Sequence, residues 1–111
     1  MNLPVFDNQI QFSDRTITLP HTVKKAFLLK GKIVVLFDPD ANLGKTEQFR
    51  NLVAISTVGV RLWEAELPTN MSSDVYYDVT PASPIIAYSF RSYTCTIDPD
   101  TGLIISKEFT K

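Results

Sequence analysis

The sequence predicts an antiparallel all-β domain, and three observations lead to this fold class. Short runs rich in β-branched and aromatic residues recur along the chain, with turn signals between them roughly every ten residues. Two segments, residues 49–67 and 93–109, each contain a strand, a turn with glycine and a second strand. The 111 residues are enough to bury one core but not two. We therefore expect a single all-β domain over residues 1–111.

The N-terminal part of the chain predicts one short hairpin. Residues 1–6 show no periodic pattern and are expected to form an arm. Residues 9–19 alternate polar with apolar side chains on both sides of Asp14 and Arg15, which is typical of two short strands joined by a turn. Pro20 ends the second strand, because proline has no N–H to donate to a neighbouring strand.

Residues 23–67 predict a first meander. Residues 23–29 are ambiguous, because Val23, Ala26 and Phe27 would also suit one face of a helix. We favour a strand, a turn at Gly31 and Lys32 and a second strand, since the second half is β-branched and aromatic. Residues 38–48 are polar and predict an exposed loop. The hairpin of residues 49–67, with Gly59 as its pivot and Trp63 in the core, completes the meander.

Residues 75–109 predict a second meander of about four strands, with turns at residues 80–84, 91–92 and 98–102. The two meanders are expected to pack face to face as a sandwich or to curl into a partly open barrel. Cys95 shares a strand face with Tyr93 and Ile97 and is therefore predicted to be a core residue. His21, beside Pro20, is expected at the surface.

Two segments carry a resemblance to a known repeat. Residues 51–63, with the pattern NLVAIS, then glycine, then Leu62 and Trp63, resemble a blade of the quinoprotein-type (PQQ-repeat-like) β-propellers. Residues 97–102, IDPDTG, resemble the turn of the same repeat, with Ile104 or Ser106 at the tryptophan position. The second copy thus lacks the tryptophan, residues 56–59 lack the acidic residue, and two blades cannot close a ring.

The chain is also similar to small uncharacterised bacterial proteins that end in the same D-x-T-G hairpin. The two resemblances imply blade-like four-stranded sheets and nothing about quinone cofactors. No functional residue is carried over from them.

Composition excludes several classes of partner. With 11 basic and 12 acidic residues the formal net charge is −1, so neither nucleic acid nor an anionic membrane is expected to bind. The longest purely apolar run, residues 33–37, is too short to span a bilayer. A single cysteine excludes an internal disulfide, and one histidine with one cysteine supplies too few ligands for zinc. We expect a soluble, cytoplasmic protein without a cofactor.

The most suggestive functional cluster is aromatic: Tyr76, Tyr77, Tyr88 and Arg91 lie within consecutive predicted strands. Adjacent residues of a strand face opposite sides, so one of Tyr76 and Tyr77 is expected to point outward. Tyrosine and arginine are favoured at interfaces, although aromatic filling of the core is a competing explanation. The sequence therefore favours a non-enzymatic interaction module, with a protein partner or self-association through sheet edges.

Three alternatives stay open. A small molecule would be held in a pocket formed by Tyr76, Tyr88 and Arg91. A hydrolase, the less favoured reading, would use acidic and serine residues near the loop before residue 75, namely Ser73, Asp74 and Asp78.

A weak calcium alternative rests on oxygen side chains at alternate positions of one loop, Asp38, Asp40 and Asn42. An EF-hand would need glycine in place of Leu43 and glutamate in place of Phe49. A turn in which Asp38 precedes Pro39 is therefore the better interpretation of this loop.

Overall fold

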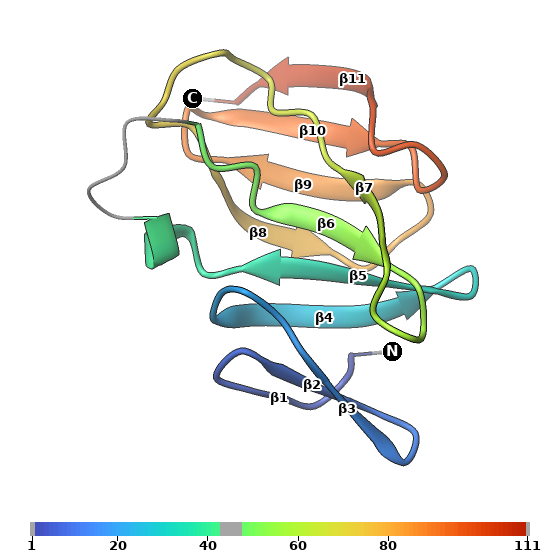
Figure 1. The fold of residues 1–111 in the computed structure, drawn as a ribbon. Coiled ribbons are helices and arrows are strands. Elements are labelled where there is room, and N and C mark those ends of the chain that lie inside the picture. The colour runs from blue at the N-terminus through green and yellow to red at the C-terminus, as the bar shows by residue number, and fades with distance from the viewer. Residues whose placement is uncertain (1, 43–47, 111) are drawn as a thin grey trace.

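The structure, a computed structural model that describes residues 2–42 and 48–110, is all-β as predicted (Figure 1). The first sheet contains β1 (Val5–Phe6), β2 (Gln9–Phe12) and β3 (Arg15–Thr18). The middle sheet contains β4 (Val23–Leu29), β5 (Lys32–Phe37), β6 (Leu52–Ile55) and β7 (Arg61–Glu64). The last sheet contains β8 (Tyr76–Thr80), β9 (Ile85–Ser89), β10 (Tyr93–Ile97) and β11 (Ile104–Phe109). A short 3-10 helix, η1 (Pro39–Asn42), follows β5.

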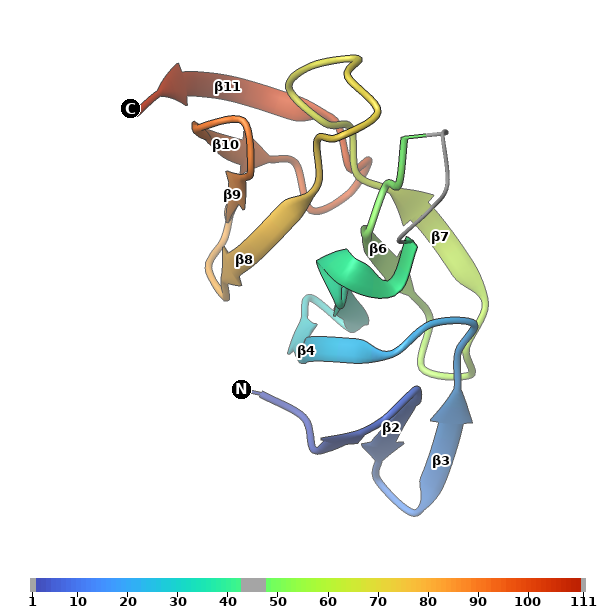
Figure 2. The same cartoon turned by 90° about the vertical axis from the view of Figure 1, so that its left-hand side faces the viewer.

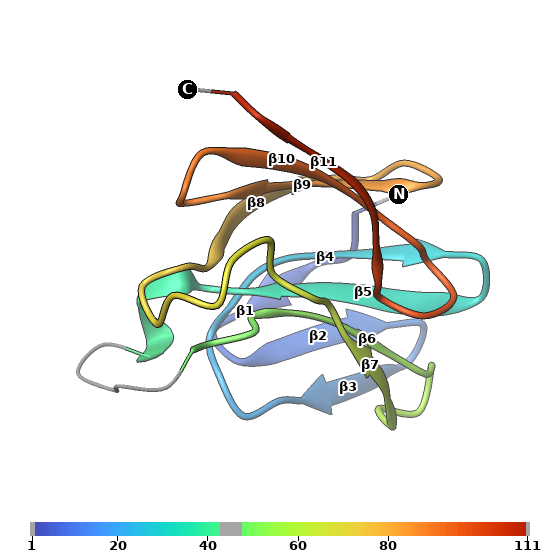
Figure 3. The same cartoon turned by 90° about the horizontal axis from the view of Figure 1, so that it is seen from above.

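Each sheet is an antiparallel meander in which hydrogen-bonded strands are also consecutive in the chain. The predicted hairpin and both four-stranded meanders are thus confirmed, and the sheets stack face to face without closing into a barrel. In Figure 2 the first, middle and last sheets follow one another from bottom to top, and in Figure 3 β9 and β10 of the last sheet lie above the other two sheets, which overlap in that view. The stacking follows from the patterning, because the middle sheet is apolar on both of its faces.

Two details of the prediction differ from the structure. The predicted N-terminal arm is wrong: residues 5–6 form β1, and Asn2 pairs with Phe27 while the N–H of Leu3 donates to the carbonyl of Ala26 at 2.8 Å. The turn between β4 and β5 contains Lys30 and Gly31, one residue earlier than predicted. Both have positive φ, 50° and 77°, as a two-residue hairpin turn requires.

The middle sheet separates two hydrophobic clusters. Towards the last sheet it presents Phe27, Leu36, Leu52 and Trp63, which pack with residues such as Val79, Ile85 and Ile97. Towards the first sheet it presents Val23, Ile33, Val35, Phe37 and Val53, which pack with Ile10 and Ile17. Trp63 and Cys95 are buried, as predicted. The core is therefore two layers of side chains held between three sheets.

Two polar contacts fix the stacking of the middle and last sheets. The amide of Asn51 is fully buried, donates to the carbonyls of Phe37 (3.0 Å) and Tyr76 (2.7 Å), and accepts from the N–H of Tyr76 (2.9 Å). The indole N–H of Trp63 donates to the carbonyl of Pro99 at 3.0 Å. The same ring covers Gly102, where an added Cβ would lie 2.6 Å from Cε3 of the indole.

The middle and last sheets are structural copies of each other. Their first two strands pair through the same register, with one extra residue at Lys24 in β4 and at Tyr77 in β8. Their last two strands also share a register, with an extra residue at Leu62 in β7 and at Ile105 in β11. Because the bulges match, residues of the two sheets occupy equivalent positions, such as Lys24 and Tyr77, or Leu62 and Ile105.

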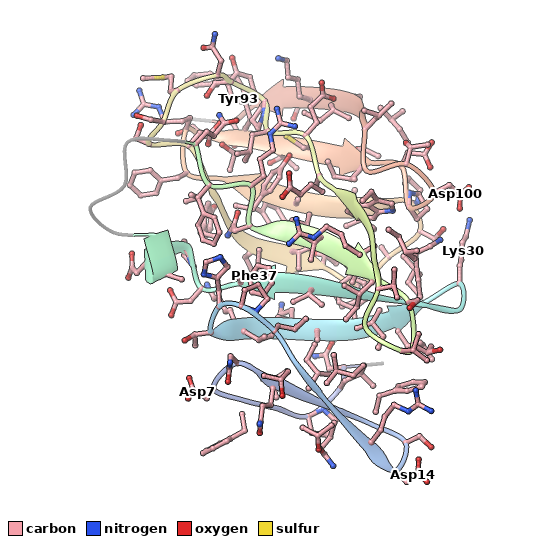
Figure 4. The ribbon with its side chains drawn as sticks, viewed as in Figure 1. Asp7, Asp14, Lys30, Phe37, Tyr93 and Asp100 are labelled. Carbon is pink, nitrogen blue, oxygen red and sulfur yellow. The ribbon has the colours of Figure 1, made fainter. Side chains whose placement is uncertain are left out.

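The two ends of the stack differ in their connections. The hairpin turns that contain Asp14, Lys30 and Asp100 lie at one end, on the right in Figure 4, whereas Asp7 and Tyr93 lie towards the other. Lys32 and Asp100 join two of these turns through an ion pair of 3.5 Å. The opposite end carries η1 and the connection from β9 to β10.

Candidate functional site

Tyr76 is a core residue. Its side chain is fully buried on the inner face of the last sheet, and its hydroxyl donates to the carbonyl of Glu66 at 2.6 Å. Burial raises the pKa of this phenol far above its ordinary value, and the neighbouring Cys95 and the acidic Asp74 and Glu66 act in the same direction. Tyr76 therefore holds the stack together and does not share a surface with the other predicted binding residues.

Tyr77 and Tyr88 meet on the outer face of the last sheet. Tyr77 is the extra residue of the β8 bulge, which turns its side chain towards solvent; it is 46% exposed. Tyr88 lies on the neighbouring strand β9, and the two ring centroids are 6.3 Å apart with the rings tilted by 40°. The hydroxyls of Tyr88 and Thr80 are 3.0 Å apart. Two of the predicted binding residues thus form one aromatic surface.

Arg91 stands at the end of the same sheet. It lies in the exposed turn between β9 and β10, where its N–H donates to the hydroxyl of Ser89 at 3.0 Å. The adjacent Phe90 is 64% exposed, and its N–H donates to the carbonyl of Val75 at 2.8 Å, which places the turn beside the start of β8. Arg91 therefore lies near the ends of β8 and β9, the strands that carry Tyr77 and Tyr88, and its side chain is accessible to a partner.

The outer face of the last sheet differs in character from its counterpart in the middle sheet. The equivalent face of the middle sheet contacts the next sheet through Phe27, Leu36, Leu52, Ala54 and Trp63. At the matching positions the last sheet carries hydroxyl side chains, namely Thr80, Tyr88, Thr94, Thr96 and Ser106, while the apolar Ile86 stands at the position of the buried Val34. We call these five residues together with Tyr77 the tyrosine face. This face suits an interface that contains water, because hydroxyl groups that stay hydrated incur no desolvation cost.

Two lysines join edge strands of the middle and last sheets, β4 and β8. Lys24 donates to the carbonyl of Tyr77, and Lys25 reaches Asp78 at 2.9 Å and the carbonyl of Val79 at 3.0 Å. The hydrogen bond from Lys25 lowers the pKa of the Asp78 carboxyl, since it stabilises the ionised form. Both lysines lie at the β4 bulge, and two of the three acceptors, on Tyr77 and Asp78, lie at the β8 bulge, so the bulges align the two strands.

The residues of the hydrolase alternative do not form one site. Asp74 is fully buried and accepts from the hydroxyls of Ser89 (2.5 Å) and Thr69 (2.8 Å), whereas Asp78 lies beside Tyr88 on the outer face and Ser73 is exposed. The carboxylate of Asp74 satisfies one buried and one partly buried hydroxyl, which is a structural role.

The lone cysteine and histidine also lie in packed surroundings. Cys95 is fully buried, and burial raises the pKa of its thiol, which keeps the sulfur in its weakly nucleophilic neutral form. His21, predicted at the surface, is half-buried and contacts the rings of Phe37 and Phe49 edge-on, with centroids 5.2 and 4.9 Å away. Sequence reasoning missed this contact because Phe49 follows a long polar loop.

The calcium alternative gains no geometric support. The carboxylate of Asp38 accepts from the N–H of Asp40 at 2.9 Å, and the carbonyl of Asp38 accepts from Ala41 at 3.0 Å, which is the expected turn. Of the other residues involved, Asp40 is exposed, the side chain of Asn42 lies outside the described part of the chain, and so does Leu43.

Comparison with known proteins gives a family without an activity. The family model described as "Domain of unknown function (DUF7957)" matches residues 1–109. The chain belongs to this family. No curated protein and no solved structure matches the chain significantly. A role for this DUF7957 domain must therefore be argued from its own surfaces.

Two further findings limit what the DUF7957 fold offers. Within residues 2–42 and 48–110 there is no helix with the length and apolar character needed to cross a membrane. Among these same residues no three His, Cys, Asp or Glu side chains are grouped so that they could hold a metal ion. The tyrosine face and the exposed strand edges are the features left to consider.

Proposed function

We propose that the chain is a non-enzymatic protein-interaction module, which binds its partner through the tyrosine face and works in the cytoplasm. The observation that carries this proposal is the pair formed by Tyr77 and Tyr88, side by side on the solvent side of the last sheet. Tyrosine combines a large apolar ring with a polar hydroxyl, so it stabilises interfaces without making the free surface insoluble.

The chemistry around the tyrosines favours a reversible contact with another protein. Thr94 lies opposite Tyr88 and Thr96 lies opposite Ile86, and Arg91 adds a positive charge at the end of the sheet. Hydroxyl groups and an arginine offer hydrogen bonds to a partner's backbone and side chains. The small-molecule alternative would require Tyr76 as a lining residue, and its burial in the core makes the protein partner the better choice.

We also propose that the sheets are related to quinoprotein-type propeller blades, with no cofactor implied. This relation is supported by the contact of Trp63 with Gly102 and Pro99 of the next sheet, because it links the two segments that carry the resemblance. The register places Ser106 at the position equivalent to Trp63, so the last sheet lacks the side chain that would reach a further blade. Among the described residues, no further sheet covers the tyrosine face.

Site-specific photo-crosslinking tests the proposed function. A photoreactive residue is placed at Thr94 on the tyrosine face and, as the matched control, at Thr16 on the outer face of the first sheet, and cross-links are compared in cells. The partner is expected at Thr94 and not at Thr16. With that partner purified, Tyr77→Ala should weaken binding about thirtyfold by calorimetry, as interface tyrosines commonly do. Equal cross-linking at both positions, or unchanged affinity of Tyr77→Ala and Tyr88→Ala, would refute the proposal.

A further inference from the structure

β8 lies at an edge of the last sheet, in the strand order β11-β10-β9-β8. The N–H of Phe90 donates to the carbonyl of Val75 at 2.8 Å, so Val75 faces the neighbouring strand β9 and Tyr76 faces away from it. The bulge then adds Tyr77, after which the alternation resumes and Val79 faces away from β9. Outward main-chain groups of this kind are a template on which a strand of another chain can pair.

Side chains occupy the outward groups of β8. The amide of Asn51 accepts from the N–H of Tyr76 at 2.9 Å and donates to its carbonyl at 2.7 Å. The carboxylate of Asp78 accepts from the N–H of Val79 at 2.9 Å, and the ammonium of Lys25 donates to the carbonyl of Val79 at 3.0 Å. The ammonium and the carboxylate are themselves 2.9 Å apart. Both main-chain groups of each outward-facing residue therefore already have a partner.

Lys24 supplies the remaining contact, since it donates to the carbonyl of Tyr77, the extra residue of the bulge. We call Lys24, Lys25, Asn51 and Asp78 the capping side chains. The two lysines lie in β4 and Asn51 directly precedes β6, so three of the four reach β8 from the side of the middle sheet. A strand that added to β8 would have to displace side chains that also connect the middle sheet to the last.

The equivalent strand of the middle sheet shows the same positions in contact with main chain. The matched bulges make Val23 and Ala26 of β4 equivalent to the two outward-facing residues of β8. The N–H of Val23 donates to the carbonyl of Asp7, and the carbonyl of Ala26 accepts from the N–H of Leu3, both at 2.8 Å. This edge position can therefore accept another segment of polypeptide, and in β8 side chains take the place of that segment.

The capping contacts are stronger than those that an incoming strand offers. Strand addition supplies neutral hydrogen bonds between N–H and C=O groups, whereas the contacts at Val79 involve an ammonium and a carboxylate. Charge-assisted hydrogen bonds are roughly twice as strong as neutral ones. Displacing Lys25 and Asp78 would also separate a partly buried ion pair. Pairing at this edge therefore loses more than it gains.

We propose that the capping side chains close β8 to strand addition, so that a second copy of the chain does not extend the last sheet through this edge. Lysine side chains commonly protect edge strands from such pairing. Here the lysines come from a neighbouring sheet and bind directly to the main chain of the edge that they protect. The tyrosine face is a separate surface formed by side chains, so the closed edge does not depend on the proposed function.

Removing three of the capping side chains should open β8. The variant that combines Lys24→Met, Lys25→Met and Asp78→Ala frees main-chain groups at Tyr77 and Val79 and leaves the buried fourth cap in place. We expect its native mass, measured by light scattering over a dilution series, to be double that of the wild type, because two open β8 edges can pair antiparallel. A wild-type mass together with a wild-type circular dichroism spectrum would overturn the proposal.

A matched control separates the opening of the edge from the change in composition. Lys30→Met, Lys32→Met and Asp100→Ala make the same kinds of substitution at hairpin turns, where Lys32 and Asp100 form an ion pair of 3.5 Å. This control changes the net charge and adds methionines to the same extent, but it opens no strand edge. We expect it to keep the wild-type mass. Association of both variants to the same degree would refute the proposal.

Amide hydrogen exchange at Val79 tests the caps with single substitutions. Asp78→Ala removes the acceptor of the Val79 N–H, whereas Asp78→Asn keeps a side-chain oxygen there. We expect the Val79 amide to exchange about tenfold faster in Asp78→Ala than in Asp78→Asn or the wild type. Unchanged exchange in Asp78→Ala would contradict the proposed cap. In the associated triple variant, this amide should be protected before dilution and exposed after it, and rapid exchange under both conditions would place the contact elsewhere and refute pairing through β8.

Discussion

At the scale of single residues, Gly102 shows how one missing Cβ allows two sheets to approach. Gly31 and Gly102 have the same φ of 77°, yet a Cβ at Gly31 would meet nothing within 4 Å, whereas one at Gly102 would overlap the Trp63 ring at 2.6 Å. Positive φ therefore destabilises an alanine at both positions to the same extent. The difference in unfolding free energy between the two alanine variants measures the clash with the indole ring alone.

We predict that Gly102→Ala destabilises the fold by about 3 kcal/mol and Gly31→Ala by about 1 kcal/mol. Urea unfolding followed by circular dichroism measures both. Combining Gly102→Ala with Trp63→Ala should cost less than the sum of the two single changes, since the second substitution removes the clashing ring. Equal destabilisation by the two glycine variants would show that the indole yields easily and that the contact is loose.

Tyr76 and Cys95 make the fold sensitive to alkaline pH. Burial raises both pKa values above the ordinary 10.0 and 9.0, so the folded state favours the neutral phenol and thiol. Stability is then full below about pH 8 and declines as the pH rises past these ordinary values, by about 1.4 kcal/mol per pH unit for each group.

We therefore expect the free energy of unfolding to fall between pH 9 and pH 11, and to fall less steeply in Tyr76→Phe. Urea titrations at several pH values give the slope. Tyr88→Phe, which removes a phenol from the outer face, serves as the control for the loss of one tyrosine hydroxyl. Parallel curves for the wild type and Tyr76→Phe would mean that the Tyr76 phenol does not limit alkaline stability.

At the scale of elements, matched bulges distinguish the roles of equivalent strands. The extra residue of β4 is Lys24, which reaches across to β8, and the extra residue of β8 is Tyr77, which points to solvent. The same geometry thus supplies an internal bridge in one sheet and an accessible side chain in the other. The difference arises because β8 lies within reach of Lys24, whereas Tyr77 is exposed.

The strands could be predicted from the sequence because their patterning is local. Gly59 and Gly102 mark their hairpins, and the β-branched run of β5 identifies a strand buried on both faces. The bulges could not be predicted, because a single extra residue leaves no periodic signal. Tyr76 and Tyr77 were correctly expected to face opposite sides, but burial of Tyr76 depends on Asn51, which is 25 residues away in the chain. The position of β11 at an edge of the last sheet could not be predicted, because the order of the strands is known only from the structure.

At the scale of the whole molecule, both end faces of the stack carry mostly polar side chains, although Phe6, which lies opposite Gln9, is 80% exposed on the first. The first sheet presents Gln9, Gln11, Thr16 and Thr18 outward, while Ile10 and Ile17 face the middle sheet. The last sheet presents the threonines of the tyrosine face. Polar outer faces on terminal units keep a repeat array soluble and finite. These polar residues lie on the outer faces of the three sheets that the structure describes, whereas the middle sheet is covered on both sides.

Placing the apolar residues of the middle sheet at the equivalent positions of the last sheet should make the tyrosine face self-associate. We expect the triple variant Thr80→Phe, Thr94→Leu and Ser106→Trp, which copies Phe27, Leu52 and Trp63, to self-associate at concentrations where the wild type is monomeric. Light scattering over a dilution series measures the native mass. The matching change in the first sheet, Thr18→Leu, alters one position only and should remain monomeric. A monomeric triple variant would indicate that the polar face is not what terminates the stack.

The consecutive order of the strands has a consequence for the time course of folding. Hairpins between neighbouring strands close short loops at little entropic cost, whereas Trp63 and Pro99, 36 residues apart in the chain, meet only when sheets dock. Gly31→Ala should therefore slow refolding, and Asn51→Ala should mainly accelerate unfolding, in stopped-flow experiments. The single tryptophan sits at the docking contact, so its fluorescence reports the final event of assembly and is silent during the first.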